Sequence, residues 1–191
     1  MKHALLLAGA ALALASCASA DYGDMRSFPP GSGAPAGAAM AMPGDPTPTA
    51  AMPYSMKAGA SDLFEIQSSQ VALQKSQNPD VRRYAQMLIA HHTQTTQTLV
   101  AAARSAGMNP PPPMLEPMQA DMIAQLQGAP ASPAFDRLYI TQQIPAHQMA
   151  LALHQTYAAR GDVPALRSAA GSAVPIVQQH LTEAQRMSGM M

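Results

Sequence analysis

The sequence is poor in the residues that most often carry chemistry in a small protein. A single cysteine among 191 residues excludes an intramolecular disulfide and any zinc or iron–sulfur site built from several cysteines. Only 12% of the residues are charged, and eleven basic residues are balanced by eleven acidic ones. Binding to nucleic acid needs a basic surface, so nucleic acid is excluded as the main partner.

Recognisable catalytic motifs are missing as well. The sequence has no glycine-rich phosphate loop, no Gly-x-Ser-x-Gly elbow and no His-Glu-x-x-His segment. Di-iron helical bundles carry paired Glu-x-x-His motifs, and none of Glu65, Glu116 and Glu183 is followed by a histidine three residues later. We therefore expect a protein that is not an enzyme, and we do not expect ferroxidase chemistry.

The N-terminus predicts export from the cytoplasm. The apolar run from Ala4 to Ala15 is too short to span a bilayer, which takes about 20 residues, but it is typical of a signal peptide. Residues 1–17 are interpreted as a lipoprotein-type signal, because Leu14-Ala15-Ser16-Cys17 resembles the bacterial lipobox, in which the cysteine is lipidated. Cys17 would then anchor an outer-membrane lipoprotein that faces the periplasm. Cleavage after Ala20 would instead release a soluble periplasmic or secreted protein.

The next segment, residues 18–59, is rich in proline, glycine, alanine and methionine and has no hydrophobic periodicity. Such a composition does not build a packed core, so we expect a disordered tether. Four of its methionines could form a thioether cluster for Cu(I), because soft sulfur ligands select that ion. The alternative, which we prefer, is a linker that merely tolerates Met40, Met42, Met52 and Met56.

From residue 60 to residue 188 the sequence is helical in character. Ser61 and Asp62 are expected to cap a first helix, and Asp162 is expected to cap the last one. Apolar residues recur at spacings of three and four, and no segment favours a strand. The pattern predicts an all-α, antiparallel four-helix bundle of the ferritin-like type, with one extra short helix and with kinks at prolines inside two helices. The expected helices cover residues 61–77, 79–106, 115–127, 133–159 and 163–187.

Histidines fall on the apolar faces of three expected helices. His92 follows Leu88 by four residues, and His147 and His180 lie on similar stripes. His91 flanks the stripe of His92, and Glu65 borders the inner face of the first helix. Two interpretations are open. Imidazole groups that converge in a bundle suit a transition metal such as Cu, Zn, Fe or Ni, with Glu65 or His91 completing the site. Alternatively, each histidine makes its own buried hydrogen bond.

The helical part resembles a known family. The resemblance lies in Val81-Arg82-Arg83-Tyr84-Ala85-Gln86-Met87-Leu88 followed by His92, in Phe135-Asp136-Arg137-Leu138-Tyr139 with His147, and in Leu166, Pro175 and His180. These segments are similar to the exported bacterial domain of unknown function 4142. The resemblance implies a ferritin-like bundle in the cell envelope and no established activity. Position 91 is usually acidic in that family and is His91 here, and Pro145 also departs from the family's pattern.

Two functions of different class follow. The first is a non-catalytic, lipid-anchored bundle of the cell envelope that binds a protein partner or acts under stress. The second is a metal-binding bundle that uses the inward-facing histidines. No cofactor is established by the sequence, and a transition metal is the one cofactor that it suggests.

Overall fold

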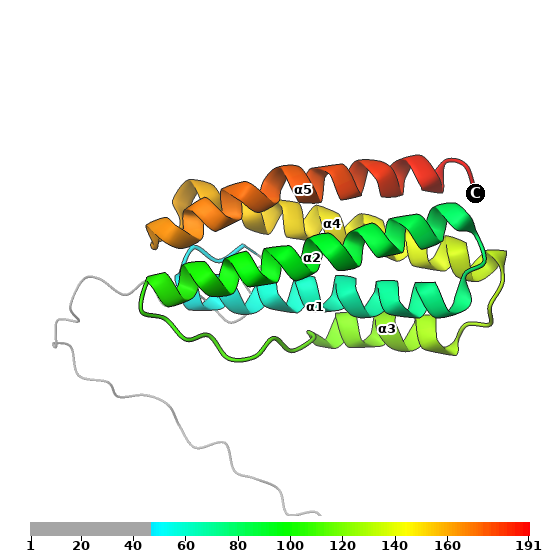
Figure 1. Cartoon of the computed structure of the whole chain (residues 1–191), viewed down its shortest axis with the longest axis horizontal. Helices are drawn as coiled ribbons and strands as arrows, with labels where there is room; N and C mark the ends of the chain where they lie inside the picture. The colour runs from blue at the N-terminus through cyan, green and yellow to red at the C-terminus, as the bar shows by residue number, and fades with distance from the viewer. Residues whose placement is uncertain (1–46) are drawn as a thin grey trace, which may run out of the picture. The chain divides into compact units, whose positions relative to one another are not determined.

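The computed structural model describes residues 47–191, and this part of the chain is all-helical (Figure 1). No strand occurs within it, and none of its helices is both long and apolar enough to cross a membrane. The prediction of an all-α bundle with one short extra helix is confirmed. The helices are α1 (Ala51–Lys75), α2 (Pro79–Ser105), α3 (Pro117–Gly128), α4 (Pro133–Arg160) and α5 (Pro164–Ser188).

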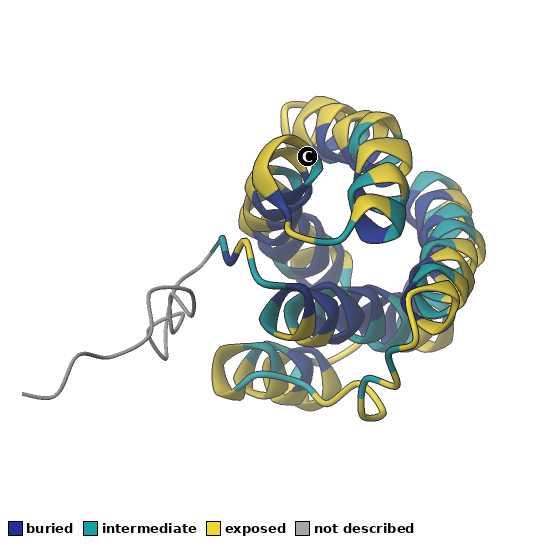
Figure 2. Cartoon of the chain, turned by 90° about the vertical axis from the view of Figure 1, so that its left-hand side faces the viewer, coloured by how far each residue is buried: buried dark blue, intermediate teal, exposed yellow. Residues whose placement is uncertain are grey.

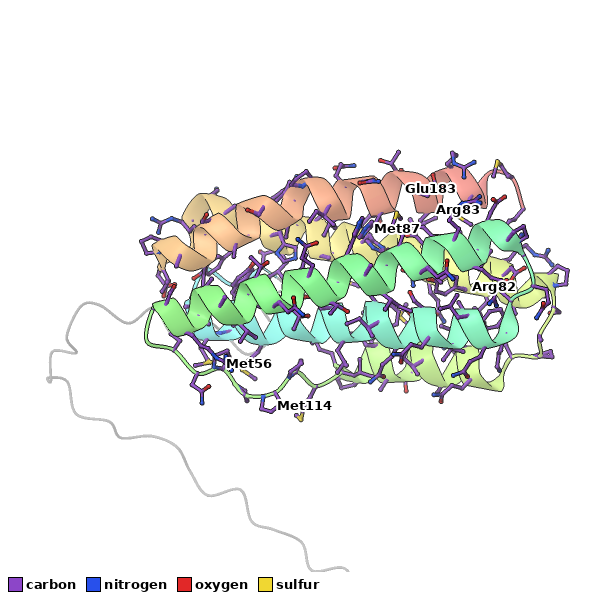
Figure 3. All side chains as sticks on the ribbon, in the orientation of Figure 1. Met56, Arg82, Arg83, Met87, Met114 and Glu183 are labelled. Carbon is purple, nitrogen blue, oxygen red and sulfur yellow. The ribbon has the colours of Figure 1, made fainter. Side chains whose placement is uncertain are left out.

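Proline and short polar residues define where most helices begin. Helices α2, α3, α4 and α5 each start with a proline, whose fixed φ suits the first helical position and whose missing N–H is not needed there. The Asn78 side chain accepts a hydrogen bond from the backbone of Asp80 (2.9 Å), and Ser132 accepts one from Phe135 (3.3 Å). Arg82, near this end of the domain in Figure 3, donates hydrogen bonds to the backbone oxygens of Leu73 in α1 and of Ser76 in the α1–α2 turn.

The start of α1 differs from the sequence-based prediction. The helix begins at Ala51, so the prediction of a tether up to residue 59 was wrong for the segment from Ala51 onward. Tertiary contacts explain the extra turns, because Tyr54 stacks on Tyr157 with ring centroids 3.8 Å apart. Asp62 is therefore not a helix cap but a buried residue inside α1. Cys17, Met40 and Met42 lie outside the described residues.

The last helix begins differently as well. Its N-cap is Val163, which makes no side-chain capping bond, so the prediction that Asp162 caps α5 was wrong. The Asp162 carboxylate instead accepts a hydrogen bond from the Tyr157 hydroxyl (2.9 Å). The turn between α4 and α5 is thus held by a local contact between the end of α4 and the turn itself.

Four long helices form the bundle, and neighbouring helices run antiparallel (Figure 1). Helices α1 and α2 make one hairpin, and α4 and α5 make the other. The hairpins meet where α2 packs on α5 and α1 packs on α4. The long connection from α2 to α4 returns along the outside, and its helix α3 packs on α1 and α4. Buried residues line the inner faces of the four long helices (Figure 2).

Two of the three hydrophobic clusters in the described residues lie along the bundle with a polar layer between them. One cluster contains Leu88, Ile140 and Ala184, and the other contains Leu99, Leu153 and Ala170. On α2, α4 and α5, a fully buried histidine falls between the two clusters. Pro145 and Pro175 lie inside α4 and α5 and are exposed, so both prolines lie on the outer side of their helices.

Candidate metal centre

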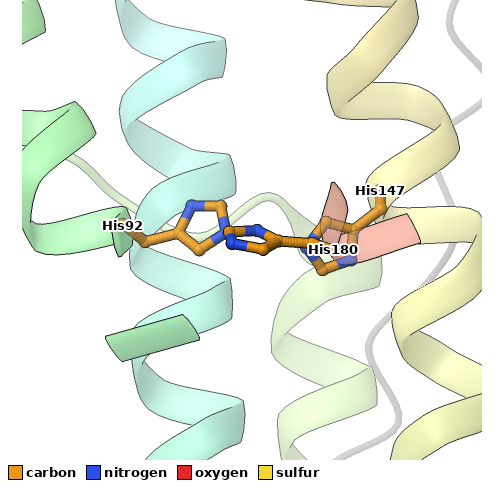
Figure 4. A group of neighbouring side chains, drawn as sticks. All are labelled: His92, His147 and His180. Carbon is orange, nitrogen blue, oxygen red and sulfur yellow. The ribbon is translucent and has the colours of Figure 1, made fainter. Parts of the chain in front are cut away.

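Three histidines from three different helices meet in the polar layer. His92 comes from α2, His147 from α4 and His180 from α5 (Figure 4). Their ring centroids are 5.0 to 5.7 Å apart, and one ring nitrogen of each lies within 4.8 Å of the others. All three side chains are at most 1% exposed. Tertiary packing thus converts three separate sequence positions into one group, which we call the histidine triad.

Each histidine of the triad is held by one ring nitrogen. His92 Nδ1 is 2.8 Å from Asp62 Oδ1, His147 Nδ1 is 2.8 Å from the backbone oxygen of Gln143, and His180 Nε2 is 2.8 Å from His91 Nδ1. The other ring nitrogen of each triad histidine is buried and has no hydrogen-bond partner among the described residues. Metal-binding histidines characteristically use one nitrogen for the metal and the other for an orienting partner. Each of the three triad histidines has this arrangement, with one nitrogen held by a partner and the other free within the described residues.

Burial keeps two of the triad histidines neutral. Loss of solvation, reinforced by His92, lowers the pKa of His147 to about 3. Loss of solvation also lowers the pKa of His180, to about 2, and the neighbouring His92, His147 and His91 add to this shift. Both imidazoles are therefore uncharged at neutral pH and keep a lone pair, which is what a metal ion requires of a histidine ligand.

His92 has different electrostatic surroundings. Burial disfavours its charged form, but the hydrogen bond to Asp62 and the charges of Asp62 and Glu65 outweigh that cost and raise the pKa of His92. The Asp62 carboxylate also accepts hydrogen bonds from Thr95 (3.0 Å) and Thr96 (2.8 Å). This carboxylate–histidine pair is the most strongly organised contact around the triad.

Glu65 lies beside the triad but outside it. Its side chain is fully buried, and one carboxylate oxygen is 3.8 Å from His147 Nδ1, the nitrogen that already contacts Gln143. Neither carboxylate oxygen has a hydrogen-bond partner among the described residues. Burial, against an opposing effect of His92, raises the pKa of Glu65 to about 8. The structure thus provides a second buried acid next to the histidines.

The five site residues predicted from the sequence have three different positions relative to the triad. His92, His147 and His180 form the triad, and Glu65 borders it. His91 is partly buried and its ring stacks against that of His180. It contacts Nε2 of His180, whereas Nδ1 of His180 is the nitrogen without a partner in the described part of the chain. As placed, His91 orients a triad histidine, and it is not part of the converging group.

Sequence reasoning missed Asp62 and Gln143. Asp62 was interpreted as a helix cap, although it precedes Glu65 by three residues and hence lies on the same face of α1. That spacing was the signal that could have identified it. Gln143 contributes a backbone oxygen, which carries no sequence signal at all.

The sequence belongs to a family without an assigned function. The domain of unknown function DUF4142 matches residues 35–187, and the chain is a member of that family. The predicted resemblance is therefore confirmed. No curated protein matches this chain.

Solved structures share the fold at low sequence identity. A DUF305 fragment from Deinococcus radiodurans has a TM-score of 0.64 and 17% identity, with 74% of this chain and 96% of that one covered. CopM in its Cu(I)-bound form has a TM-score of 0.61 and 19% identity, covering 72% and 94% of the two chains. CopM in its Cu(II)-bound form has a TM-score of 0.61 and 16% identity, covering 73% and 96%. At these identities the similarity shows a common helical fold.

Proposed function

We propose that this protein binds one transition-metal ion, with copper as the favoured ion, through His92, His147 and His180. The observation that carries the proposal is that three buried imidazoles each have one fixed nitrogen and one nitrogen without a partner. A buried polar atom without a partner costs about 1–3 kcal/mol. One metal ion would satisfy the three unpaired nitrogens together. If the histidines served only to make their separate hydrogen bonds, these three nitrogens would stay unpaired.

The donor set favours copper on chemical grounds. Imidazole nitrogens suit Zn, Cu, Fe and Ni, and among divalent first-row ions a nitrogen site binds copper most tightly. Structural zinc sites use four protein ligands, whereas the triad supplies three nitrogens. In the metal-bound state, where His92 would also be neutral, three imidazoles with the carboxylate of Asp62 behind them would balance the charge of Cu(I). The similarity of the fold to CopM, whose structures include Cu(I)-bound and Cu(II)-bound forms, supports the choice of metal.

We propose a binding role for this site, without catalysis. The three side chains are at most 1% exposed, so a substrate other than the ion itself has no direct approach to them. The Cys17 lipobox and the signal-like N-terminus support a location in the cell envelope, with the protein anchored to the outer membrane through lipid. A bundle that holds copper there would store or buffer the ion outside the cytoplasm. A protein partner would be needed only to receive it.

The test is the metal content of the full chain, purified from its native compartment without an affinity tag. We expect about one copper per chain in the wild type and a loss of at least tenfold in metal affinity in His147→Gln. The matched control is His154→Gln, which replaces another buried histidine of α4 that bonds Tyr54 (3.0 Å) and lies outside the triad. Equal copper content in both variants, or no binding by the wild type after incubation with Cu(I), would refute the proposal.

A further inference from the structure

The exposed large hydrophobic side chains in the described part of the chain are all methionines. No leucine, isoleucine, valine or phenylalanine is among them. Surfaces that dock proteins are enriched in aromatic residues as well as in methionine, and no aromatic side chain is among the exposed large hydrophobic residues of the described part. What distinguishes methionine is its sulfur, a soft and polarisable ligand atom. The exposed residues are Met52, Met56, Met114, Met118, Met149, Met190 and Met191.

Several of these methionines gather where the extended segment before α3 passes α1. Met56 of α1 is 49% exposed and Met114 is 78% exposed, and both line one hollow of about 580 Å³. Figure 3 shows both side chains on this face of the domain. Met52 lies one turn before Met56 on the same face of α1. We call Met52, Met56 and Met114 the methionine face.

A second hollow continues this surface. It has a volume of about 230 Å³ and is lined by Met118 and Met122 of α3 and by Met149 of α4. Both hollows also share Lys57 and Glu116 in their walls. Sulfur atoms from two further helices thus lie next to the methionine face.

The charges in this region exclude a site for a hard cation. Calcium and magnesium need several oxygen ligands, usually with carboxylates among them. The carboxylate shared by both hollows, that of Glu116, is paired with the Lys57 ammonium at 2.7 Å. The pair is neutral as a whole, so thioether sulfurs are the ligands that remain. Neutral soft ligands favour a soft ion of low charge.

We propose that the methionine face is a surface site for a soft monovalent metal ion, Cu(I) or Ag(I), held by Met56 and Met114 with Met52 adjacent. The site is separate from the histidine triad in its residues and in its ligand chemistry, so it stands whether or not the triad binds metal. Exposure makes it accessible to an ion that arrives from solvent. Unbranched methionine side chains can move to bring their sulfurs together around that ion.

The test uses Ag(I), which is redox-stable, and the full chain labelled with ¹³C at the methionine ε-methyl groups. We expect the methyl signals of Met56 and Met114 to shift on addition of Ag(I), while those of Met190 and Met191 stay in place. The variant Met56→Leu/Met114→Leu keeps the surface apolar but removes both sulfurs, so it should bind about one Ag(I) fewer than the wild type. The matched control, Met190→Leu/Met191→Leu, removes two exposed sulfurs elsewhere and should bind as the wild type does.

Three outcomes decide the matter. Loss of one Ag(I) in Met56→Leu/Met114→Leu alone supports the site, and retention of that ion in His147→Gln separates it from the triad. Equal Ag(I) binding by both leucine variants and the wild type would overturn the proposal. Unshifted Met56 and Met114 signals with normal copper binding at the triad would also overturn it, and they would leave the proposed function intact.

Discussion

At the residue scale, three neighbouring histidines differ in the direction in which their surroundings shift the pKa. His147 and His180 are kept neutral by burial, whereas Asp62 raises the pKa of His92. The ring centroids of His92 and His180 are nevertheless only 5.0 Å apart. The difference arises mainly from Asp62, with Glu65 adding to it, because only His92 among the three hydrogen-bonds a carboxylate through its outer nitrogen. Asp62 is therefore the residue that makes the triad asymmetric.

The first prediction concerns this carboxylate. Asp62→Asn keeps the size of the side chain but removes the charge that orients the His92 ring. Loss of such an outer partner typically lowers metal affinity about 10- to 100-fold, and we expect a reduction of that order, measured by competition with a chromophoric copper chelator. Asp136→Asn is the control, because Asp136 is also buried on the bundle's inner side but lies about 16 Å along α4 from His147. Similar losses in both variants would contradict the orienting role of Asp62.

Helical periodicity was enough to identify the three triad histidines as inward-facing, because each lies on an apolar stripe. It could not assign Asp62, since a Ser-Asp pair before an apolar run is also a normal helix start. It placed His91 beside the stripe of His92, but it could not decide whether His91 completes the site or supports another histidine. The contact of His91 with His180 depends on how α2 packs on α5, and that is not a local property.

At the element scale, α1 is the helix that the sequence describes least well. Its first turns contain Pro53 and the exposed Met52 and Met56, a composition that favours a linker. The helix forms there because Tyr54 and Ala58 are buried against α4 and α5 residues of the same hydrophobic cluster. Long-range packing thus decides the conformation of a segment whose own composition does not.

The second prediction concerns the close approach of Gly161 to the ring of Tyr157 at the end of α4. A Cβ atom added at Gly161 would overlap the ring of Tyr157, which in turn stacks on Tyr54. Overpacking of this kind typically costs about 1–3 kcal/mol, so we expect Gly161→Ala to lower the free energy of unfolding by that amount in urea. The control is Gly128→Ala at the end of α3, where a Cβ would meet nothing within 4 Å. That variant should be neutral or more stable by about 0.5 kcal/mol, and equal destabilisation of both variants would contradict the packing argument.

At the scale of the whole molecule, the bundle has a polar layer between two hydrophobic clusters. Several buried polar groups occupy it at once, so their protonation is linked to the stability of the whole domain. His154, His147 and His180 all have a lowered pKa because burial disfavours the imidazolium. Each of them loses this neutral, buried environment when the chain unfolds.

The third prediction is a loss of stability in acid. Burial lowers the pKa of His154 to about 4, although nearby Asp62 opposes the shift and His92 adds to it, while the unfolded value stays near 6.5. Between these values the unfolded chain binds more protons, so stability falls as the pH falls below 6.5. From pH 7.5 to pH 5, His154 alone should cost about 2 kcal/mol.

The measurement is the urea midpoint of metal-free protein at both pH values. His154→Gln cannot take up this proton, so its loss of stability between pH 7.5 and pH 5 should be smaller than that of the wild type by about 2 kcal/mol. Tyr54, which bonds His154, does not titrate in this range because burial raises its pKa. An identical pH dependence in the two proteins would show that His154 contributes nothing to acid sensitivity.

The sequence by itself determined which segments are helical from Pro79 onward, the helical class of the fold and the inward direction of three histidines. All of these depend on spacing along one chain segment, on prolines at helix starts and on apolar periodicity. Only the tertiary structure decided that the histidines share one level of the bundle, that Asp62 and His91 support them and that α1 begins at Ala51. Those features depend on the relative axial positions of α1, α2, α4 and α5, which are set by packing between residues far apart in the sequence.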